Sequence, residues 1–166
     1  MKFHFKIDDN LRIVIIKDLA RPHRHAHERV GFLRTHHALS LDGAVILARE
    51  YLPVVDEHYI PDRSVGARID ANAIRRAIEW ADGWPGGIFH IHKHFGSGVP
   101  QFSRDDLDGN ARLIPSFFNI APLGLHGAVV LSDDSLNGAV WTGKNKPSSA
   151  FSSVSILGGP PHRWRE

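Results

Sequence analysis

The segment from Asp70 to His92 changes its hydrophobic period partway along, and this change limits what the chain can fold into more than any other feature. In DANAIRRAIEWAD, apolar residues stand at positions 74, 77, 78 and 81, which is the spacing of one face of an α-helix. Asp70 can cap the start of this helix, and Gly83 and Pro85 mark its end. A short apolar run typical of a strand follows directly, over residues 86–92. The chain therefore combines helix with sheet.

The first third of the chain is expected to be mostly sheet. Phe3 to Ile7 alternates apolar and polar residues, and Leu11 to Ile16 is a β-branched run, so the two predict a hairpin around the turn Asp8-Asp9-Asn10. Val30 to Arg34 and Ala44 to Ala48 predict two further strands.

The second half predicts one more helix and three more strands. The helix is expected to begin near Ser103 and to end before Pro115. The strands are expected at residues 127–131, 138–141 and 154–157, and the segment 144–166 is otherwise rich in loops. We expect residues 1–166 to form one domain, because a chain of this length builds one proper core and is short for two.

Composition removes several classes of function. No apolar run reaches the length needed to cross a bilayer, and the amino terminus MKFHFKIDD does not resemble a secretion signal, so we expect a cytoplasmic protein without a membrane partner. The formal charge is only +2 and the basic residues are scattered, which argues against nucleic acid as a partner. The chain has no cysteine, so any metal must be held by histidine and carboxylate groups.

The stretch FHIHKHFGSGVPQFSRDD, residues 89–106, contains candidate metal ligands. In an extended segment, alternate side chains share a face, so His90 and His92 can meet one metal ion. Asp106, one turn into the following helix, can supply a third ligand. His94 has the same parity and remains an alternative ligand or substrate contact. Ser103 and the acids after it also fit a plain helix cap, which is the structural alternative.

His-x-His, a loop, Ser-x-x-Asp and an upstream glutamate together resemble the JAMM motif of the MPN (JAB) domain metallopeptidases. The glutamate is Glu28 in the segment ERVGFL, which is similar to the family's Glu-x-x-Gly-x-Leu. The order of elements also fits, as does the later segment GAVVLSDDSLNGAVW. The resemblance implies an α/β fold of the cytidine-deaminase-like type, with a mixed curved sheet flanked by helices.

The resemblance also implies a role for each residue of the motif. His90, His92 and Asp106 would ligate Zn²⁺, Glu28 would be the general base, and Ser103 would hydrogen-bond the oxyanion. The chain departs from the family's pattern where Lys93 replaces the usual proline, and the loop 93–102 is about three residues longer than the commonest form. His23, His25 and His27 are expected in a helix or loop that leads into the glutamate strand.

A zinc isopeptidase or peptidase that cleaves after the tail of a ubiquitin-like modifier is the function that the resemblance implies. Its partners would be a ubiquitin-like protein or its conjugates, together with E1-like and E2-like enzymes of the same bacterial conjugation or antiviral system. One alternative is a non-catalytic MPN-type module that binds a ubiquitin-like partner. Another is a metal-dependent phosphoester hydrolase, for which the chain shows no cluster of Arg and Lys around the site.

Overall fold

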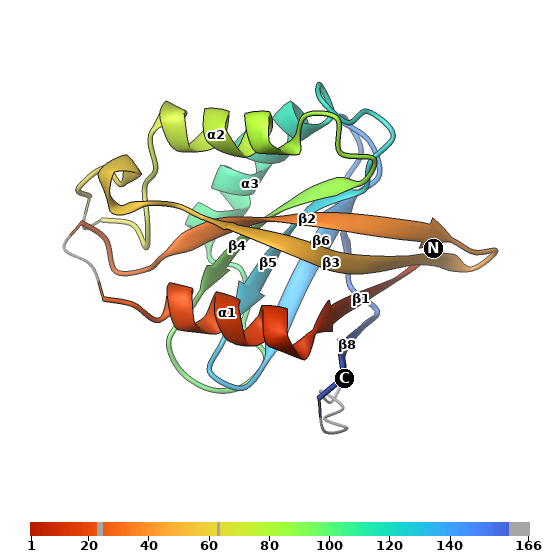
Figure 1. The fold of residues 1–166 in the computed structure, drawn as a ribbon, viewed down its shortest axis with the longest axis horizontal. Helices are drawn as coiled ribbons and strands as arrows, with labels where there is room; N and C mark the ends of the chain where they lie inside the picture. Colours follow the sequence, from red (N-terminus) through yellow and green to blue (C-terminus); the bar gives the residue numbers. More distant parts are fainter. Residues whose placement is uncertain (23–24, 63, 160–166) are drawn as a thin grey trace.

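The computed structural model describes residues 1–22, 25–62 and 64–159, and within them eight strands form one mixed sheet (Figure 1). Its order is β7-β6-β5-β4-β2-β3-β1-β8. The strands are β1 (Lys2–Asp8), β2 (Val30–Leu39), β3 (Gly43–Pro53), β4 (Gly87–Lys93), β5 (His126–Leu131), β6 (Leu136–Trp141), β7 (Ser149–Ala150) and β8 (Ser153–Leu157). The helices are α1 (Asp9–Leu19), α2 (Ala71–Ala81) and α3 (Arg104–Phe117), with a short 3₁₀ helix, η1, at Asp56–His58.

Helices cover both faces of the sheet, with α1 on one face and α2 and α3 on the other (Figure 1). Successive strand residues point to opposite faces, so Leu33 joins the core beneath α1 while Phe32 joins the core beneath α2 and α3. Phe89 and Ile88 divide in the same way. Full burial of an aromatic or aliphatic side chain of this kind contributes about 1.5–3 kcal/mol. The expected α/β architecture, a curled mixed sheet flanked by helices, is confirmed at this level.

The carboxyl-terminal segment connects the two edges of the curled sheet. β7 pairs with β6 at one edge and β8 pairs with β1 at the other, and only residues 151–152 separate β7 from β8. The backbone N–H of Phe151 donates to Gly138 O at 3.0 Å, and that of Ser152 donates to Phe3 O at 2.7 Å. The Phe151 ring stacks on Phe5 at 4.9 Å between centroids. The tail therefore contains the strand predicted at 154–157, which is β8, and a second one, β7, that was not predicted; residues 160–166 lie outside the described part.

The predicted hairpin over residues 3–16 is wrong in its second half. Phe3 to Ile7 lies in β1, but Leu11 to Ile16 lies in α1. The predicted turn is a helix start, because the Asp8 carboxylate accepts hydrogen bonds from the backbone N–H groups of residues 10 and 11. The buried residues of α1, Ile15 and Leu19, are four positions apart, so packing on the sheet overrides the β propensity of the run.

The predicted end of the second helix is also wrong. α3 continues through Pro115 to Phe117, and its buried residues are Asn110, Ile114 and Phe117. Leu107, in the first half of the helix, is exposed. The prediction of α2 with Asp70 as its cap is confirmed, since the Asp70 side chain accepts a hydrogen bond from Ala73 N at 2.8 Å. None of the described helices is long and apolar enough to cross a membrane.

The sheet places the two halves of the sequence motif side by side. β4 lies in the centre of the sheet, between β2 and β5. β2 runs antiparallel to β4, and Val30 at the start of β2 is paired with His92 near the end of β4. The residues that precede β2 therefore lie next to the histidines that end β4, although about 60 residues separate them in sequence.

Candidate metal centre

β4 and the residue after it carry the three alternating histidines. His90 and His92 point to the face covered by α3, while Phe89 and Ile91 point into the core on the α1 side. His94 follows the end of the strand, and its backbone N–H donates to Leu131 O at 2.8 Å, so the extended course continues past Lys93. The spacing alone allows either histidine pair to share a ligand, and the approach of the other elements decides between them.

The start of α3 brings Asp106 to two of these histidines. Asp106 Oδ1 lies 3.2 Å from His92 Nε2, and Asp106 Oδ2 lies 3.3 Å from His94 Nε2. Burial opposes ionisation of Asp106, but the contact with His92 and hydrogen bonds from Ser103 outweigh it, so the pKa of the carboxyl group lies below its usual range. Asp106 is therefore held as a carboxylate, the form that binds metals.

Ser103 is the N-cap of α3, as the structural alternative predicted. Its hydroxyl accepts a hydrogen bond from Asp106 N at 3.1 Å, and Asp106 Oδ2 accepts one from Ser103 N at 2.7 Å. This capping box fixes the Asp106 side chain in place. The cap and the ligand interpretations are compatible, because the box orients the same carboxylate that faces the histidines.

Glu28 reaches the cluster from the loop that precedes β2. Its Oε1 lies 3.7 Å from His94 Nε2. Burial raises the pKa of the Glu28 carboxyl group, and the neighbouring His92 and His94 act in the opposite direction. The Glu28 backbone N–H donates to Gly66 O at 2.9 Å, and a Cβ added at Gly66 would lie 2.3 Å from Glu28 Oε2. The absence of a side chain at Gly66 therefore gives the carboxylate its space.

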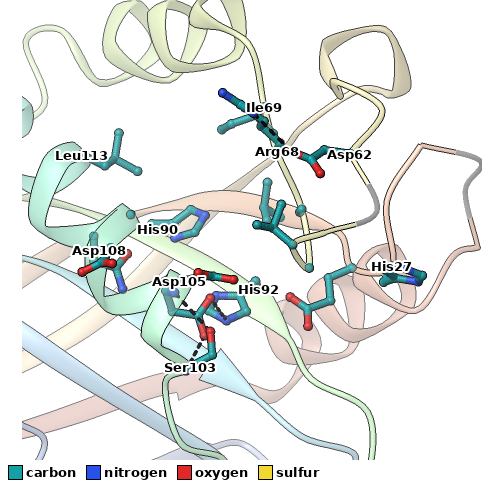
Figure 2. Close-up of a pocket in the computed structure, with 18 of the residues that line it drawn as sticks. His27, Asp62, Arg68, Ile69, His90, His92, Ser103, Asp105, Asp108 and Leu113 are labelled. Atoms are coloured by element: carbon teal, nitrogen blue, oxygen red, sulfur yellow. Dashed lines mark hydrogen bonds and ion pairs between the residues drawn. The ribbon is translucent and has the colours of Figure 1, made fainter.

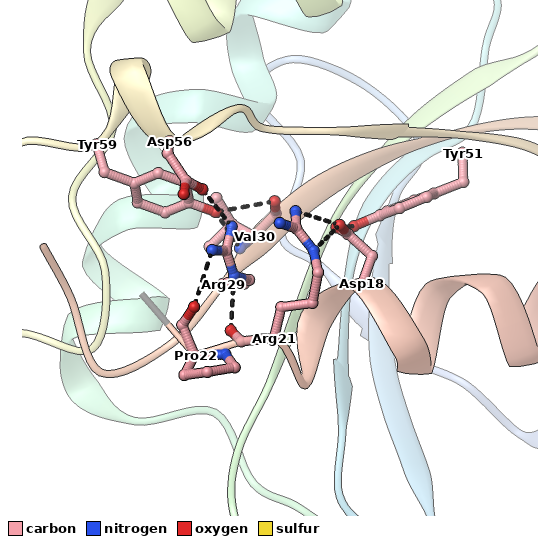
Figure 3. Close-up of polar contacts among 8 residues, drawn as sticks. All are labelled: Asp18, Arg21, Pro22, Arg29, Val30, Tyr51, Asp56 and Tyr59. Carbon is pink, nitrogen blue, oxygen red and sulfur yellow. Dashed lines mark hydrogen bonds and ion pairs between the residues drawn. The ribbon is translucent and has the colours of Figure 1, made fainter. Parts of the chain in front are cut away.

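Arg29 fixes the loop that carries Glu28 from the other side (Figure 3). Its side chain is 2 % exposed and donates from Nε to Arg21 O at 2.7 Å, from Nη2 to Pro22 O at 3.2 Å, and from Nη1 to Asp56 Oδ1 at 2.7 Å. Tyr59 completes this Arg29 network: its hydroxyl accepts a bond from Val30 N at 2.9 Å. No sequence pattern indicated this role of Arg29, Asp56 or Tyr59.

Four side chains form one possible metal-binding group: Glu28, His92, His94 and Asp106. Their ligand atoms all lie within 4.8 Å of one another. Glu28, His92 and Asp106 were expected at the site, and the structure brings them together with His94 in place of His90. The Nε2 atoms of His92 and His94 are 3.2 Å apart. Such a set of imidazole and carboxylate donors suits zinc.

His90 lies earlier along β4, outside this group (Figure 2). Together with Asn110 it forms part of the pocket wall. Burial lowers the pKa of His90 to about 3, while an interaction with the Asn110 side chain acts in the opposite direction. Three buried nitrogens at this end of the pocket have no hydrogen-bond partner within the protein: His90 Nδ1, His92 Nδ1 and Asn110 Nδ2.

A cavity of about 1140 Å³ opens over the four-residue group. α3 forms one wall, and the segment that precedes α2 forms the opposite wall, which includes Asp62 and Arg68 (Figure 2).

His27 lines the cavity but is not part of the metal-binding group, and His25 lies in the same loop. His23 lies outside the described residues. The sequence offered no signal for Gly66 or Asn110, whose importance depends on contacts between distant segments.

Comparisons with known proteins add little to this geometry. No family model matches the chain, and no curated protein matches it. Among solved structures, the N-terminal domain of STIL from Trichoplax adhaerens aligns over 81% of this chain and 40% of its own length, with 12% identity and a TM-score of 0.33. The chain thus spans less than half of that structure, and a likeness this low supports no conclusion about fold or function. What the structure itself defines is an α/β protein with a candidate metal centre in a large cavity.

Proposed function

We propose that the chain is a zinc-dependent peptidase of the JAMM type, which cleaves the peptide or isopeptide bond after the tail of a ubiquitin-like modifier. The observation that carries the proposal is the convergence of Glu28, His92, His94 and Asp106 at one wall of the cavity. These residues come from the same motif elements that the sequence shares with the MPN (JAB) family. A finer assignment of the fold to that family is part of the proposal.

His92, His94 and Asp106 are the proposed zinc ligands. Catalytic zinc sites take three protein ligands and leave a position open, and this set provides two imidazoles and one carboxylate. The pair His92 and His94 also suits the family's pattern better than His90 and His92, because the loop up to Ser103 then covers residues 95–102 and not 93–102. The loop thus becomes two residues shorter and closer to the commonest form.

Glu28 is the proposed general base. Zinc, when bound, would supply Lewis acidity that lowers the pKa of a water molecule to near 7. Glu28 is partly buried, faces His94, and has a raised pKa, so it can take up a proton and later return it to the leaving amine. Gly66 holds the backbone of Glu28 and leaves room for its carboxylate.

Ser103 is the proposed donor to the oxygen of the scissile carbonyl. In the capping box its hydroxyl oxygen accepts from Asp106 N, and its O–H, which also interacts with the Asp106 carboxylate, can donate to a substrate. Ser103 is exposed at the N-terminus of α3, beside the Asp106 carboxylate that faces the histidines. A fixed donor at this position can stabilise negative charge that develops on the carbonyl oxygen.

The cavity suits an extended polypeptide tail. α3 and the segment before α2 form two opposing walls, and the four-residue group lies between them. A tail that ends in small residues can enter such a groove and bring its last carbonyl to the metal. The proposed partners are accordingly a ubiquitin-like protein or its conjugates, with E1-like and E2-like enzymes acting on the same modifier.

The two alternative functions are less well supported. A pure binding module has no need of four converging metal-binding side chains. A phosphoester hydrolase needs cations to bind phosphate, but among the described residues the cavity wall contains, besides Asp106, three further aspartates and two arginines: Asp62, Asp105, Asp108, Arg68 and Arg112. This balance is unfavourable for a polyanionic substrate.

The proposal is tested by measuring zinc content and peptidase activity on the same preparations. Wild type is expected to contain about one zinc per chain and to cleave a ubiquitin-like fusion protein in a chelator-sensitive manner, while leaving nucleic acid intact. Glu28→Gln is expected to keep its zinc and to lose activity by about a hundredfold or more. Full activity of Glu28→Gln would refute the base assignment, and absence of zinc from wild type would refute the function.

A matched pair of variants decides between the two ligand sets. His94→Ala is expected to lose zinc, because it removes a member of the group, whereas His90→Ala is expected to retain it. Elemental analysis after gel filtration measures both. The opposite result, with zinc lost only from His90→Ala, would restore His90, His92 and Asp106 as the ligand set.

A further inference from the structure

The loop between β4 and α3 carries His94 at its start and leads to Ser103, so its shape determines where both groups lie. We infer that the β5–β6 turn Ser132–Ser135 is the positioning element of this loop, and that its aspartates set the zinc affinity of the site without touching the metal. The inference rests on the proposed function, because it concerns the same metal site.

Two aspartates of the turn hold the backbone of the loop. Gly96 N donates to Asp133 Oδ2 at 3.2 Å, and Asp133 N donates back to Gly96 O at 2.9 Å. Gly98 N donates to Asp134 Oδ1 at 2.7 Å. Ser132, which is buried, donates from its hydroxyl to Gly98 O at 2.7 Å. Both glycines thus use backbone groups to bind side chains of a single turn.

The backbone at Gly96 and Gly98 has the conformation that these contacts require. The φ angles are 102° and 91°, in the region that residues with a side chain rarely adopt, and no heavy atom lies within 4 Å of a Cβ added at either position. The glycines are therefore needed for the direction of the chain and not for lack of space. Without outside contacts, a loop with two such glycines has many conformations to choose from.

Lys93 ties the same turn to the strand between the two proposed histidine ligands. Its side chain points away from His92 and His94, is 7 % exposed, and forms an ion pair with Asp133. The ion pair and the loop contacts together restrain the chain on both sides of His94.

The acidic turn is not itself a second metal site. Asp133 is engaged by Lys93 and by Gly96 N, and Asp134 by Gly98 N and the Ser132 hydroxyl. The described residues contain one group of histidine and carboxylate side chains close enough to share a metal ion, and the turn is not in it. Its carboxylates act as hydrogen-bond acceptors for a loop.

Zinc affinity is the measurement that separates positioning from a general structural role. Asp134→Ala is expected to bind Zn²⁺ about 10- to 100-fold more weakly than wild type in competition with a chromophoric chelator, a range typical of groups that orient metal ligands. Asp134→Asn keeps an oxygen that can accept from Gly98 N and is expected to restore affinity close to wild type. Asp42→Ala, an exposed aspartate in the distant β2–β3 turn, is the matched control.

One further readout and one further variant keep the test decisive. The visible absorption of the Co²⁺-substituted protein is expected to change in Asp134→Ala and not in Asp42→Ala, because a displaced His94 alters the coordination of the metal. Asp133→Ala serves as the second variant if Asp134→Ala does not fold, and it is expected to weaken zinc binding in the same direction.

The outcomes distinguish this inference from the proposed function. If the wild-type protein binds zinc and both Asp134→Ala and Asp133→Ala bind it with unchanged affinity, the inference is overturned and the proposed metal site is unaffected. Weak binding in Asp134→Asn equal to that in Asp134→Ala would also overturn it, since the hydrogen bond to Gly98 would then not matter. A wild-type protein that takes up no zinc would overturn the proposed function and this inference with it.

Discussion

Two buried polar regions lie close to the candidate metal centre, and they differ in how completely their hydrogen bonds are formed. In the Arg29 network all three guanidinium nitrogens donate to oxygen atoms of the protein (Figure 3). At the end of the pocket, by contrast, nitrogens of His90, His92 and Asn110 are buried with no partner in the protein. Both regions use polar side chains where apolar ones would pack more simply.

The difference indicates that the paired region stabilises the fold, whereas the unpaired region belongs to the binding cavity. A buried polar group that is fully paired stabilises one arrangement of the chain, whereas an unpaired one costs free energy. The Arg29 network joins the loop before β2 to the segment after β3. It therefore fixes the backbone of the loop that carries Glu28. The residues that carry the unpaired nitrogens line the cavity, where a bound metal or substrate can engage polar side chains. We therefore expect substitutions in the two regions to have different effects on stability.

Replacing Arg29 is expected to have the largest effect on stability. Arg29→Met removes three hydrogen bonds, one of which is also the ion pair with Asp56, from a side chain that is 2 % exposed, and we expect the free energy of unfolding to fall by about 3–5 kcal/mol. Urea unfolding followed by circular dichroism measures the loss. Arg75→Met, at an exposed position of α2, is the control and should change stability by less than about 0.5 kcal/mol. Equal stability of the two variants would mean that the network does not hold the loop.

His126 provides a second fully paired group, and its effect is visible in the pH dependence of stability. Nδ1 accepts from Ile88 N at 3.0 Å, and Nε2 lies 2.8 Å from Ala121 O, to which it donates. Burial lowers the pKa of His126 from the ordinary 6.5 to about 4, although these hydrogen bonds act in the opposite direction. The folded protein thus holds His126 neutral.

The sign of the effect follows from proton binding. Between pH 6.5 and pH 4 the unfolded state binds a proton at His126 that the folded state does not, so the free energy of unfolding falls as the pH falls, by about 3 kcal/mol over this window. Denaturant titrations with chelator present, across pH 7 to pH 4, measure it. His126→Asn, whose oxygen can still accept from Ile88 N, should show a correspondingly flatter profile. An unchanged profile in this variant would contradict the prediction.

Residue patterns predicted most of the fold where periodicity and local stop signals agreed. α2 has both its apolar stripe and its cap in the sequence, and the structure has it at Ala71–Ala81. The strand prediction for Leu11 to Ile16 is wrong because these β-branched residues also fit a helix, and only the packing of α1 on the sheet decides between the two. Pro115 predicts the end of a helix, yet α3 continues two residues beyond it. In both cases tertiary contacts outweigh local preference.

The site was predictable in its composition but not in its selection of histidines. Alternation along β4 places His90, His92 and His94 on one side of the chain, and alternation alone does not say which two the aspartate meets. The start of α3 decides this, because Asp106 lies 3.2 Å from His92 and 3.3 Å from His94. The role of Gly66 could not be predicted either, because its contact with Glu28 joins residues 38 positions apart in the sequence.

Asn110 offers the smallest expected effect and the sharpest contrast with Arg29. Asn110→Leu removes an interaction with His90, but it also removes a buried Nδ2 that has no partner in the protein. The two contributions oppose each other, so we expect the free energy of unfolding to change by less than about 1 kcal/mol in either direction. Zinc content should stay at the wild-type level, because Asn110 is outside the metal-binding group. A loss comparable to that of Arg29→Met, measured in the same urea titration, would show that the Asn110 amide is as fully engaged as the guanidinium, and the contrast between the two regions would no longer hold.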